Sequence, residues 1–168
     1  MVFGEKVIAT GFPELASSSA VVLGPTGVAL SRSGTLYVAD TEANRIAAIP
    51  GAAFRQSAFG GGGITVSSGG GLNAPLGMTL APNGDIVTVN GNDGVVVETN
   101  PAANPAGRQV AQLDTGFGGG SLFGVTIPPG ADKVYLVDDG TNTLAALQPG
   151  PDLVGAEPSG VSAPKAPG

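Results

Sequence analysis

The sequence predicts an all-β fold, because one short pattern occurs three times and each copy reads as a set of short strands. The copies begin at Gly27, Gly77 and Gly124, so that 50 and 47 residues separate their starts. A period of roughly 40–50 residues built from short strands is typical of a β-propeller. Glycines and prolines cluster between the apolar runs, as expected for a sheet fold that is rich in turns.

Each copy contains three predicted strands, which we name a, b and c in chain order. Tight turns join a to b, and Asn83-Gly84 in the second copy is a strong hairpin signal because glycine tolerates positive φ. A weaker strand, d, follows the first two copies, and a similar segment, residues 6–10, precedes the first copy. The predicted strands are 27–30, 77–80 and 124–127 for a, 36–39, 86–89 and 134–137 for b, 45–49, 95–98 and 143–147 for c, and 63–67 and 109–113 for d.

Residues 1–148 are therefore predicted to form an arc of three blades, with repeats near 27–67, 77–113 and 124–147. The remaining residues, 149–168, are rich in Pro and Gly and are expected to lack stable structure. A propeller ring needs about four to eight blades, so three cannot close one. If each open blade face exposes roughly 500 Å² of apolar surface, leaving both faces bare costs about 25 kcal/mol. This exceeds the usual net stability of a domain.

Two arrangements would complete the ring. Two chains can join head to tail as a six-bladed homodimer, with residues 6–10 of each chain completing the third blade of the other. Alternatively, the chain is half of a longer six-bladed protein. The predicted partner is thus either a second copy of the chain or a missing N-terminal half.

Composition excludes several classes of function. The chain has no Cys and no His, so neither a Ser-His-Asp nor a Cys-His nucleophile can be built, nor an ordinary zinc site. Seven scattered basic residues and a net charge of −6 argue against binding to nucleic acid or to anionic membranes. No apolar run approaches the length of a membrane-spanning helix, and the first residues lack a signal-peptide pattern. We expect either an intracellular protein or a mature or truncated piece of a longer one.

Three segments of the first copy carry the clearest motif: Gly27-Val-Ala-Leu, Gly34-Thr-Leu-Tyr-Val-Ala-Asp40 and Asn44-Arg-Ile. They resemble the NHL family of propeller repeats. The second copy has Asn90 in place of the aspartate, and the third has Thr143 where arginine is usual in that family. The glycine-rich, lysine-poor style also resembles uncharacterised bacterial proteins of NHL type, many of them exported. The resemblance implies a propeller, but such propellers include binding modules, scaffolds and a few enzymes.

Asp40, Asn90 and Asp138 share one register at the end of strand b and are the candidate ligands of a cation. Carboxylate and amide oxygens suit calcium, so the three could form a ring of ligands. Alternatively, each side chain accepts backbone N–H bonds from its own b–c turn. Equivalent positions on successive blades are far apart, which favours turn anchoring and no bound metal.

Two further positions have competing interpretations. Tyr37 and Tyr135 hold equivalent places, and Val87 holds that place in the second copy, which favours a core position between blades over stacking on a ligand. Arg45 directly precedes strand c and is expected at the surface or paired with Glu42.

The long d–a connections indicate which face binds. In a propeller they share a face with the b–c turns, whereas the tight a–b turns leave the other face bare. Long loops on a rigid scaffold usually carry binding, so we expect a ligand or partner at the loop face. Phe12, Phe117 and Phe123 lie in or beside these loops and would either form an apolar contact patch or anchor the loops to the sheets.

The sequence favours a non-enzymatic binding or scaffold module, and no catalytic residue is predicted. The alternative is a metal-dependent hydrolase that resembles the six-bladed lactonases or strictosidine synthase. Such an enzyme would hold its metal at the channel mouth through oxygen ligands, for which Asp40, Asn90 and Asp138 are the residues placed to serve.

Overall fold

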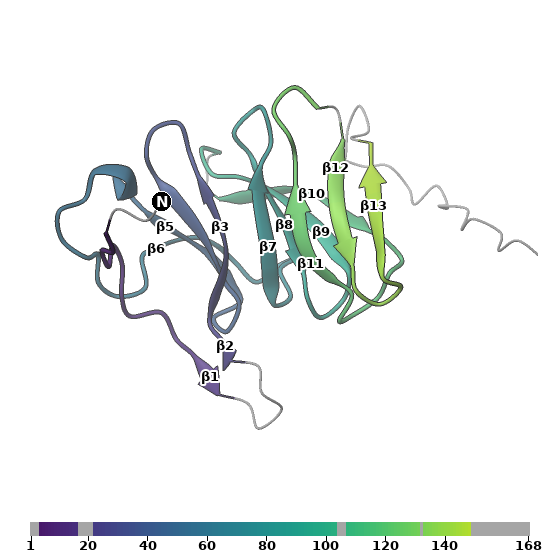
Figure 1. The fold of residues 1–168 in the computed structure, drawn as a ribbon, viewed down its shortest axis with the longest axis horizontal. Helices are drawn as coiled ribbons and strands as arrows, with labels where there is room; N and C mark the ends of the chain where they lie inside the picture. The colour runs from purple at the N-terminus through teal and green to yellow at the C-terminus, as the bar shows by residue number, and fades with distance from the viewer. Residues whose placement is uncertain (1–3, 17–21, 104–106, 132, 149–168) are drawn as a thin grey trace, which may run out of the picture.

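The computed structural model describes four stretches of the chain: residues 4–16, 22–103, 107–131 and 133–148. Within them the fold is all-β, apart from one short 3-10 turn, η1 (Ala52–Phe54) (Figure 1). No helix in these stretches is long and apolar enough to cross a membrane. The predicted tail, residues 149–168, lies outside the described residues.

Three antiparallel sheets follow one another along the chain, and within each sheet neighbouring strands are consecutive in sequence. The first sheet contains β3 (Pro25–Leu30), β4 (Leu36–Asp40), β5 (Arg45–Ile49) and β6 (Ile64–Ser68). The second contains β7 (Pro75–Leu80), β8 (Ile86–Asn90), β9 (Val95–Asn100) and β10 (Arg108–Asp114). The third contains β11 (Leu122–Thr126), β12 (Val134–Asp138) and β13 (Thr143–Leu147). A small extra sheet pairs β1 (Leu15–Ala16) with β2 (Val22–Leu23).

These strands confirm the predicted a, b and c strands of all three copies and the d strands of the first two. In the described part of the chain, no strand pairs with the outer edge of β13. Among the described residues the third sheet therefore has three strands, in agreement with the three strands that the sequence of this copy predicted.

The glycine that starts each copy lies at an irregularity in the first strand of its sheet, where the register shifts. A Cβ atom on Gly27 would lie 2.3 Å from the carbonyl oxygen of Leu76, and one on Gly77 would lie 2.2 Å from that of Phe123. Only glycine fits here, because β3, β7 and β11 approach one another backbone to backbone.

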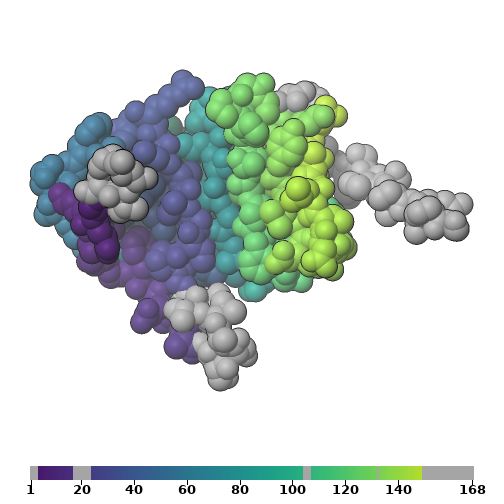
Figure 2. All heavy atoms as spheres, in the orientation of Figure 1, coloured from purple at the N-terminus to yellow at the C-terminus, as the bar shows by residue number. Residues whose placement is uncertain are grey.

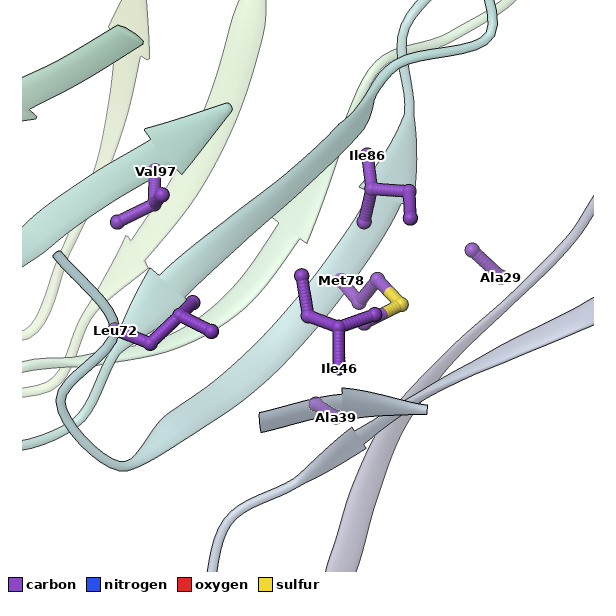
Figure 3. Close-up of a cluster of buried hydrophobic side chains, with 7 residues drawn as sticks. All are labelled: Ala29, Ala39, Ile46, Leu72, Met78, Ile86 and Val97. Atoms are coloured by element: carbon purple, nitrogen blue, oxygen red, sulfur yellow. The ribbon is translucent and has the colours of Figure 1, made fainter. Parts of the chain in front are cut away.

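Apolar clusters join the sheets face to face, as the blades of a propeller are joined. Figure 3 shows the cluster between the first and second sheets, which comprises Ala29, Ala39, Ile46, Leu72, Met78, Ile86 and Val97. The cluster between the second and third sheets comprises Val87, Val89, Val96, Leu122 and Leu136.

The prediction of a strand at residues 6–10 is wrong, because the structure forms no strand there. Only Ala9 forms a bridge, and it is a parallel one to Phe59 of the same chain. The Thr10 N–H donates to the Phe59 carbonyl at 2.8 Å, and the Phe59 N–H donates to the Ile8 carbonyl at 2.9 Å.

The segment lies there because its apolar side chains cover the outward face of the first sheet. Ile8, Ala9, Phe12 and Phe59 pack against a cluster that comprises Val38, Ala47, Ile49 and Ala52. Figure 2 shows the N-terminal residues (purple) over the first sheet, whereas the third sheet (green to yellow) forms the opposite end of the molecule.

Candidate functional site

A groove of about 850 Å³ opens on the predicted loop face. It lies where the β4–β5 turn, the β8–β9 turn and the β6–β7 connection meet the inner strands β3, β7 and β11. Half of its lining residues have hydrogen-bonding side chains, namely Thr26, Thr41, Glu42, Asn44, Asn73 and Asn92, although most of the exposed lining surface is apolar. Leu76 and Phe123, a residue that is 48% exposed, supply apolar surface.

Threonine hydroxyls join the first sheet to the second on one side of this groove. The Thr41 hydroxyl donates to the Pro75 carbonyl at 2.7 Å and shares a hydrogen bond of 2.9 Å with the Thr26 hydroxyl. The Leu76 carbonyl lies 3.0 Å from the same Thr26 hydroxyl, whose single proton is shared between Leu76 and Thr41. The start of β7 is thereby fixed against both β3 and the β4–β5 turn.

Asn44 makes a second connection between the two sheets. Its φ of 49° lies in the left-handed region, which asparagine tolerates better than most residues. The side-chain oxygen accepts from the Ala74 N–H at 2.9 Å, and the side-chain amide donates to the Leu72 carbonyl at 2.9 Å.

A chain of polar contacts continues to the β8–β9 turn. The Asn73 amide donates to Asp93 at 2.9 Å, and the Asn73 oxygen accepts from the exposed Asn92 at 3.1 Å. Asp93 in turn accepts from the Val95 N–H at 3.0 Å. Because both turns are tied to the connection between them, the groove wall is pre-organised.

Among the groove residues given by the described stretches, Glu42 carries the one charge. Arg45 on the adjacent strand is engaged elsewhere, since its Nε and Nη2 atoms both lie 2.8 Å from Oδ2 of Asp40. The predicted pairing of Arg45 with Glu42 is therefore wrong, because the buried Asp40 is its direct neighbour across the β4–β5 pair. The described lining residues thus offer no cation to a negatively charged ligand.

Asp40, Asn90 and Asp138 are buried, one on each sheet. Asp138 anchors its own turn, since it accepts from the Gly140 N–H at 2.9 Å and from the Thr141 hydroxyl. Asp40 instead binds Arg45, and the Asn90 amide donates to the Gly71 carbonyl at 2.7 Å. Turn anchoring thus describes Asp138, whereas the other two bind partners outside their turns.

Two oxygens of this set, Oδ1 of Asp40 and Oδ1 of Asn90, are buried without a hydrogen-bond partner. They belong to different sheets. Within the described stretches, no three His, Cys, Asp or Glu side chains gather as metal ligands.

The three phenylalanines are not brought into one cluster. Phe12 packs on the outward side of the first sheet, and Phe117 packs against the cluster between the second and third sheets. Phe123 lines the groove. Loop anchoring therefore describes Phe12 and Phe117, and Phe123 alone of the three faces the groove.

Tyr37, Val87 and Tyr135 occupy the same position in the three sheets. In the first two sheets this position packs against the next sheet along the chain. Tyr37 packs against the first interface cluster, where burial raises the pKa of its hydroxyl, and Val87 belongs to the second cluster. Tyr135, in the third sheet, is 41% exposed.

A smaller cavity of about 360 Å³ opens between the second and third sheets, beside the β7–β8 turn on the face predicted to be bare. Its one carboxylate among the described lining residues is Glu98. Burial, and then the charge of Asp85, raise the pKa of Glu98.

Sequence reasoning missed most of the groove wall, including Thr26, Thr41, Asn73 and Asn92. For Thr41 and Asn92 the available signal was a Thr or Asn within a b–c turn, whereas Thr26 lies in β3 and Asn73 in the β6–β7 connection. Their partners lie on other sheets, as for Thr41 and Pro75, which are 34 residues apart in sequence.

Comparison with known proteins bears on the fold. Residues 23–49 match the family model described as the NHL repeat. No curated protein matches the chain.

Three solved structures of lyases are similar. A catalytically inactive virginiamycin B lyase from Staphylococcus aureus with quinupristin has 17% identity and a TM-score of 0.48 over 74% of this chain and 41% of the lyase. The selenomethionine-substituted virginiamycin B lyase from the same organism has 11% identity and a TM-score of 0.44, over 75% of this chain and 41% of the lyase. A streptogramin B lyase has 16% identity and a TM-score of 0.36, over 82% of this chain and 58% of the lyase. The chain thus spans less than two thirds of each of these proteins. The matched residues, 23–49, contain β3, β4 and β5, so the match falls on the copy that carries the predicted motif.

Proposed function

We propose that the chain is a binding module whose groove holds a small, neutral, hydroxyl-rich molecule such as a saccharide. The observation that carries the proposal is the pre-organised groove of about 850 Å³ between the inner strands and the b–c turns. Its volume falls within the usual range of ligand sites, about 300–1,000 Å³.

The chemistry of the wall selects this class of ligand. Amide and hydroxyl groups of Asn73, Asn92 and Thr26 provide hydrogen-bonding surface, and the half-exposed Phe123 ring offers a face for stacking. The carboxylate of Glu42 accepts hydrogen bonds from hydroxyls and disfavours anionic ligands. Because the wall is already held by its own bonds, little ordering opposes binding.

In the same proposal the three sheets are three blades of a six-bladed ring, which a partner completes. The face-to-face clusters between sheets and the shared irregularity in β3, β7 and β11 support this arrangement. The groove would then lie at the mouth of the central channel.

The test is an NMR titration with a panel of neutral mono- and disaccharides. We expect saturable shifts of the side-chain amides of Asn73 and Asn92, and a loss of affinity of about fivefold in Phe123→Ala. Phe54→Ala is the matched control, because Phe54 is 78% exposed and lies outside the groove. Absence of saturable shifts with every sugar, or shifts confined to the cavity at Glu98, would contradict the proposal.

The metal-dependent hydrolase has one observation in its favour, the two unpartnered buried oxygens of Asp40 and Asn90. The engagement of Asp40 with Arg45 and of Asp138 with its turn speaks for the binding module. We expect calcium to leave the midpoint of thermal unfolding unchanged. A rise of several degrees in millimolar calcium, abolished by Asp138→Ala, would favour the hydrolase.

A further inference from the structure

We propose that the outward face of the third sheet binds β3 of a second copy of this chain, so that two copies share the same head-to-tail interface twice. The inference goes beyond ligand binding and rests on the blade arrangement of the proposed function.

The third sheet carries the receiving side of an interface that the first two sheets already form. Ile46 and Val96 occupy the second position of their sheets' third strands, face the following sheet, and are 0% and 7% exposed. Leu144 holds that position in β13 and is 82% exposed.

The middle strand repeats this contrast. Ala39 and Val89 are fully buried against the following sheet, whereas their equivalent Val137 is 36% exposed. Val137 pairs with Leu144 across β12 and β13. Together with the exposed Tyr135, these two residues form a continuous apolar surface on the third sheet.

The first sheet carries the complementary side. Met78, the residue after Gly77 in β7, is 7% exposed and packs between the first and second sheets. Val28 is the equivalent residue of β3 and is 56% exposed, as is the nearby Leu30 at 54%. The chain therefore exposes apolar side chains on β3 at positions that are buried or partly buried in β7.

The glycine positions mark how closely the strands would approach. Gly27 and Gly77 each lie against a carbonyl oxygen of the next inner strand, and the residue that supplies it, Leu76 or Phe123, directly precedes that strand's own starting glycine. A Cβ on Gly124 would meet only Val137, at 2.9 Å, and no backbone. Thr26 of a second copy precedes Gly27 as Phe123 precedes Gly124, so its carbonyl fits the place beside Gly124.

The N-terminal segment leaves β3 open to this docking but covers part of the face that an equivalent junction would use. In both existing junctions the backbone contact is greatest at the first strand of the following sheet, with β7 against β3 and β4, and β11 against β7 and β8. Ile86 and Val97, on later strands of the second sheet, also enter the first junction, and their equivalents Leu36 and Ala47 lie under the N-terminal segment, so the second copy docks through β3. Ile8, Ala9 and Phe12 cover the side formed by β4 and β5, and β3 keeps its apolar residues exposed.

A second copy is the favoured occupant because one chain carries both halves of the interface. Two arcs of three blades give six, and a head-to-tail pair with two-fold symmetry closes without leaving either face bare.

Sedimentation of the full chain tests the proposal. We expect a mass twice the 16.2 kDa of one chain, and 16.2 kDa for Leu144→Lys and for Val28→Lys with unchanged circular dichroism. Leu15→Lys, on the small β1–β2 sheet, is the matched control and should keep the double mass. A wild-type chain that stays at 16.2 kDa up to high concentration would overturn the proposal, as would a dimer that survives Val28→Lys.

Mixing the two lysine variants tests the head-to-tail geometry. One copy of each leaves one interface unaltered, so an equimolar mixture should recover part of the double mass. No recovery would contradict the geometry. Because the groove lies within one chain, monomeric Leu144→Lys should still bind saccharide, so failure of the ligand proposal and failure of the docking proposal give different results.

Discussion

The first and third sheets have nearly the same strand pattern but different neighbours. The first is covered on one face by the second sheet and on the other by the N-terminal segment, whereas the third is covered by the second sheet alone among the described residues. Ile46 and Leu144 occupy equivalent positions and are 0% and 82% exposed. An apolar residue at this position is therefore buried only where another sheet follows its own sheet along the chain.

The turns after the middle strands differ as well. Arg45 binds Asp40 and also reaches toward β6, where it donates to Thr65 at 2.7 Å and to the Gly62 carbonyl at 2.9 Å. The third sheet has Thr143 at the position of this arginine and, among the described residues, no fourth strand to contact. The arginine is thus useful where a fourth strand is present.

The largest difference between the sheets should come from the starting glycines. In Gly77→Ala the new Cβ would lie 2.2 Å from the Phe123 carbonyl, so we expect a loss of about 4 kcal/mol or more in the free energy of unfolding. Gly124→Ala meets only the Val137 side chain and should cost about 1 kcal/mol in the single chain. Urea unfolding at low protein concentration measures the free energy of unfolding of both variants. Equal losses would contradict the expected difference between the two glycine positions.

Next in size are the equivalent residues of the third strands. Ile46→Ala creates a cavity in the first interface cluster and should cost about 3 kcal/mol at every protein concentration. Leu144→Ala should change stability by less than about 0.5 kcal/mol in dilute solution, and more only where the chain associates. A large loss for Leu144→Ala in the monomer would mean that its side chain is buried after all.

A smaller contrast is expected at the turns. Arg45→Met leaves the carboxylate of Asp40 buried without its partner and should cost about 2 kcal/mol. Thr143→Val removes only an exposed contact with Thr141 and should be nearly neutral. Thermal unfolding of the two variants decides the comparison, and a neutral Arg45→Met would show that the ion pair adds little.

The smallest effect concerns Glu98, between the second and third sheets. Its raised pKa means that the folded chain binds a proton more tightly than the unfolded chain, so stability falls as pH rises through the interval from the ordinary glutamate pKa to the raised one. Glu98→Gln should therefore raise the unfolding midpoint by about 1–2 °C at pH 7 and leave it unchanged well below the ordinary pKa. A decrease in the unfolding midpoint of Glu98→Gln at pH 7 would contradict a raised pKa of Glu98 in the folded chain.

Local patterns were sufficient to predict the strands. The bounds of β5 and β13 agree with the predicted 45–49 and 143–147, because apolar residues and turn residues lie next to each other in sequence. The N-terminal segment was assigned wrongly because its partner, Phe59, lies 50 residues from Ala9 and is preceded by a loop without a strand pattern. The same limit applies to the groove, since the loop face followed from loop lengths but the contact between Asn44 and Ala74 joins two different copies.

The contacts of Thr41 with Pro75 and of Asn44 with Ala74 also affect how the protein comes apart. Separation of the first two sheets must break the wall of the groove, so a molecule seated across it would slow unfolding as well as shift its equilibrium. Even a weakly bound sugar would then lengthen the survival of the chain in the presence of a protease.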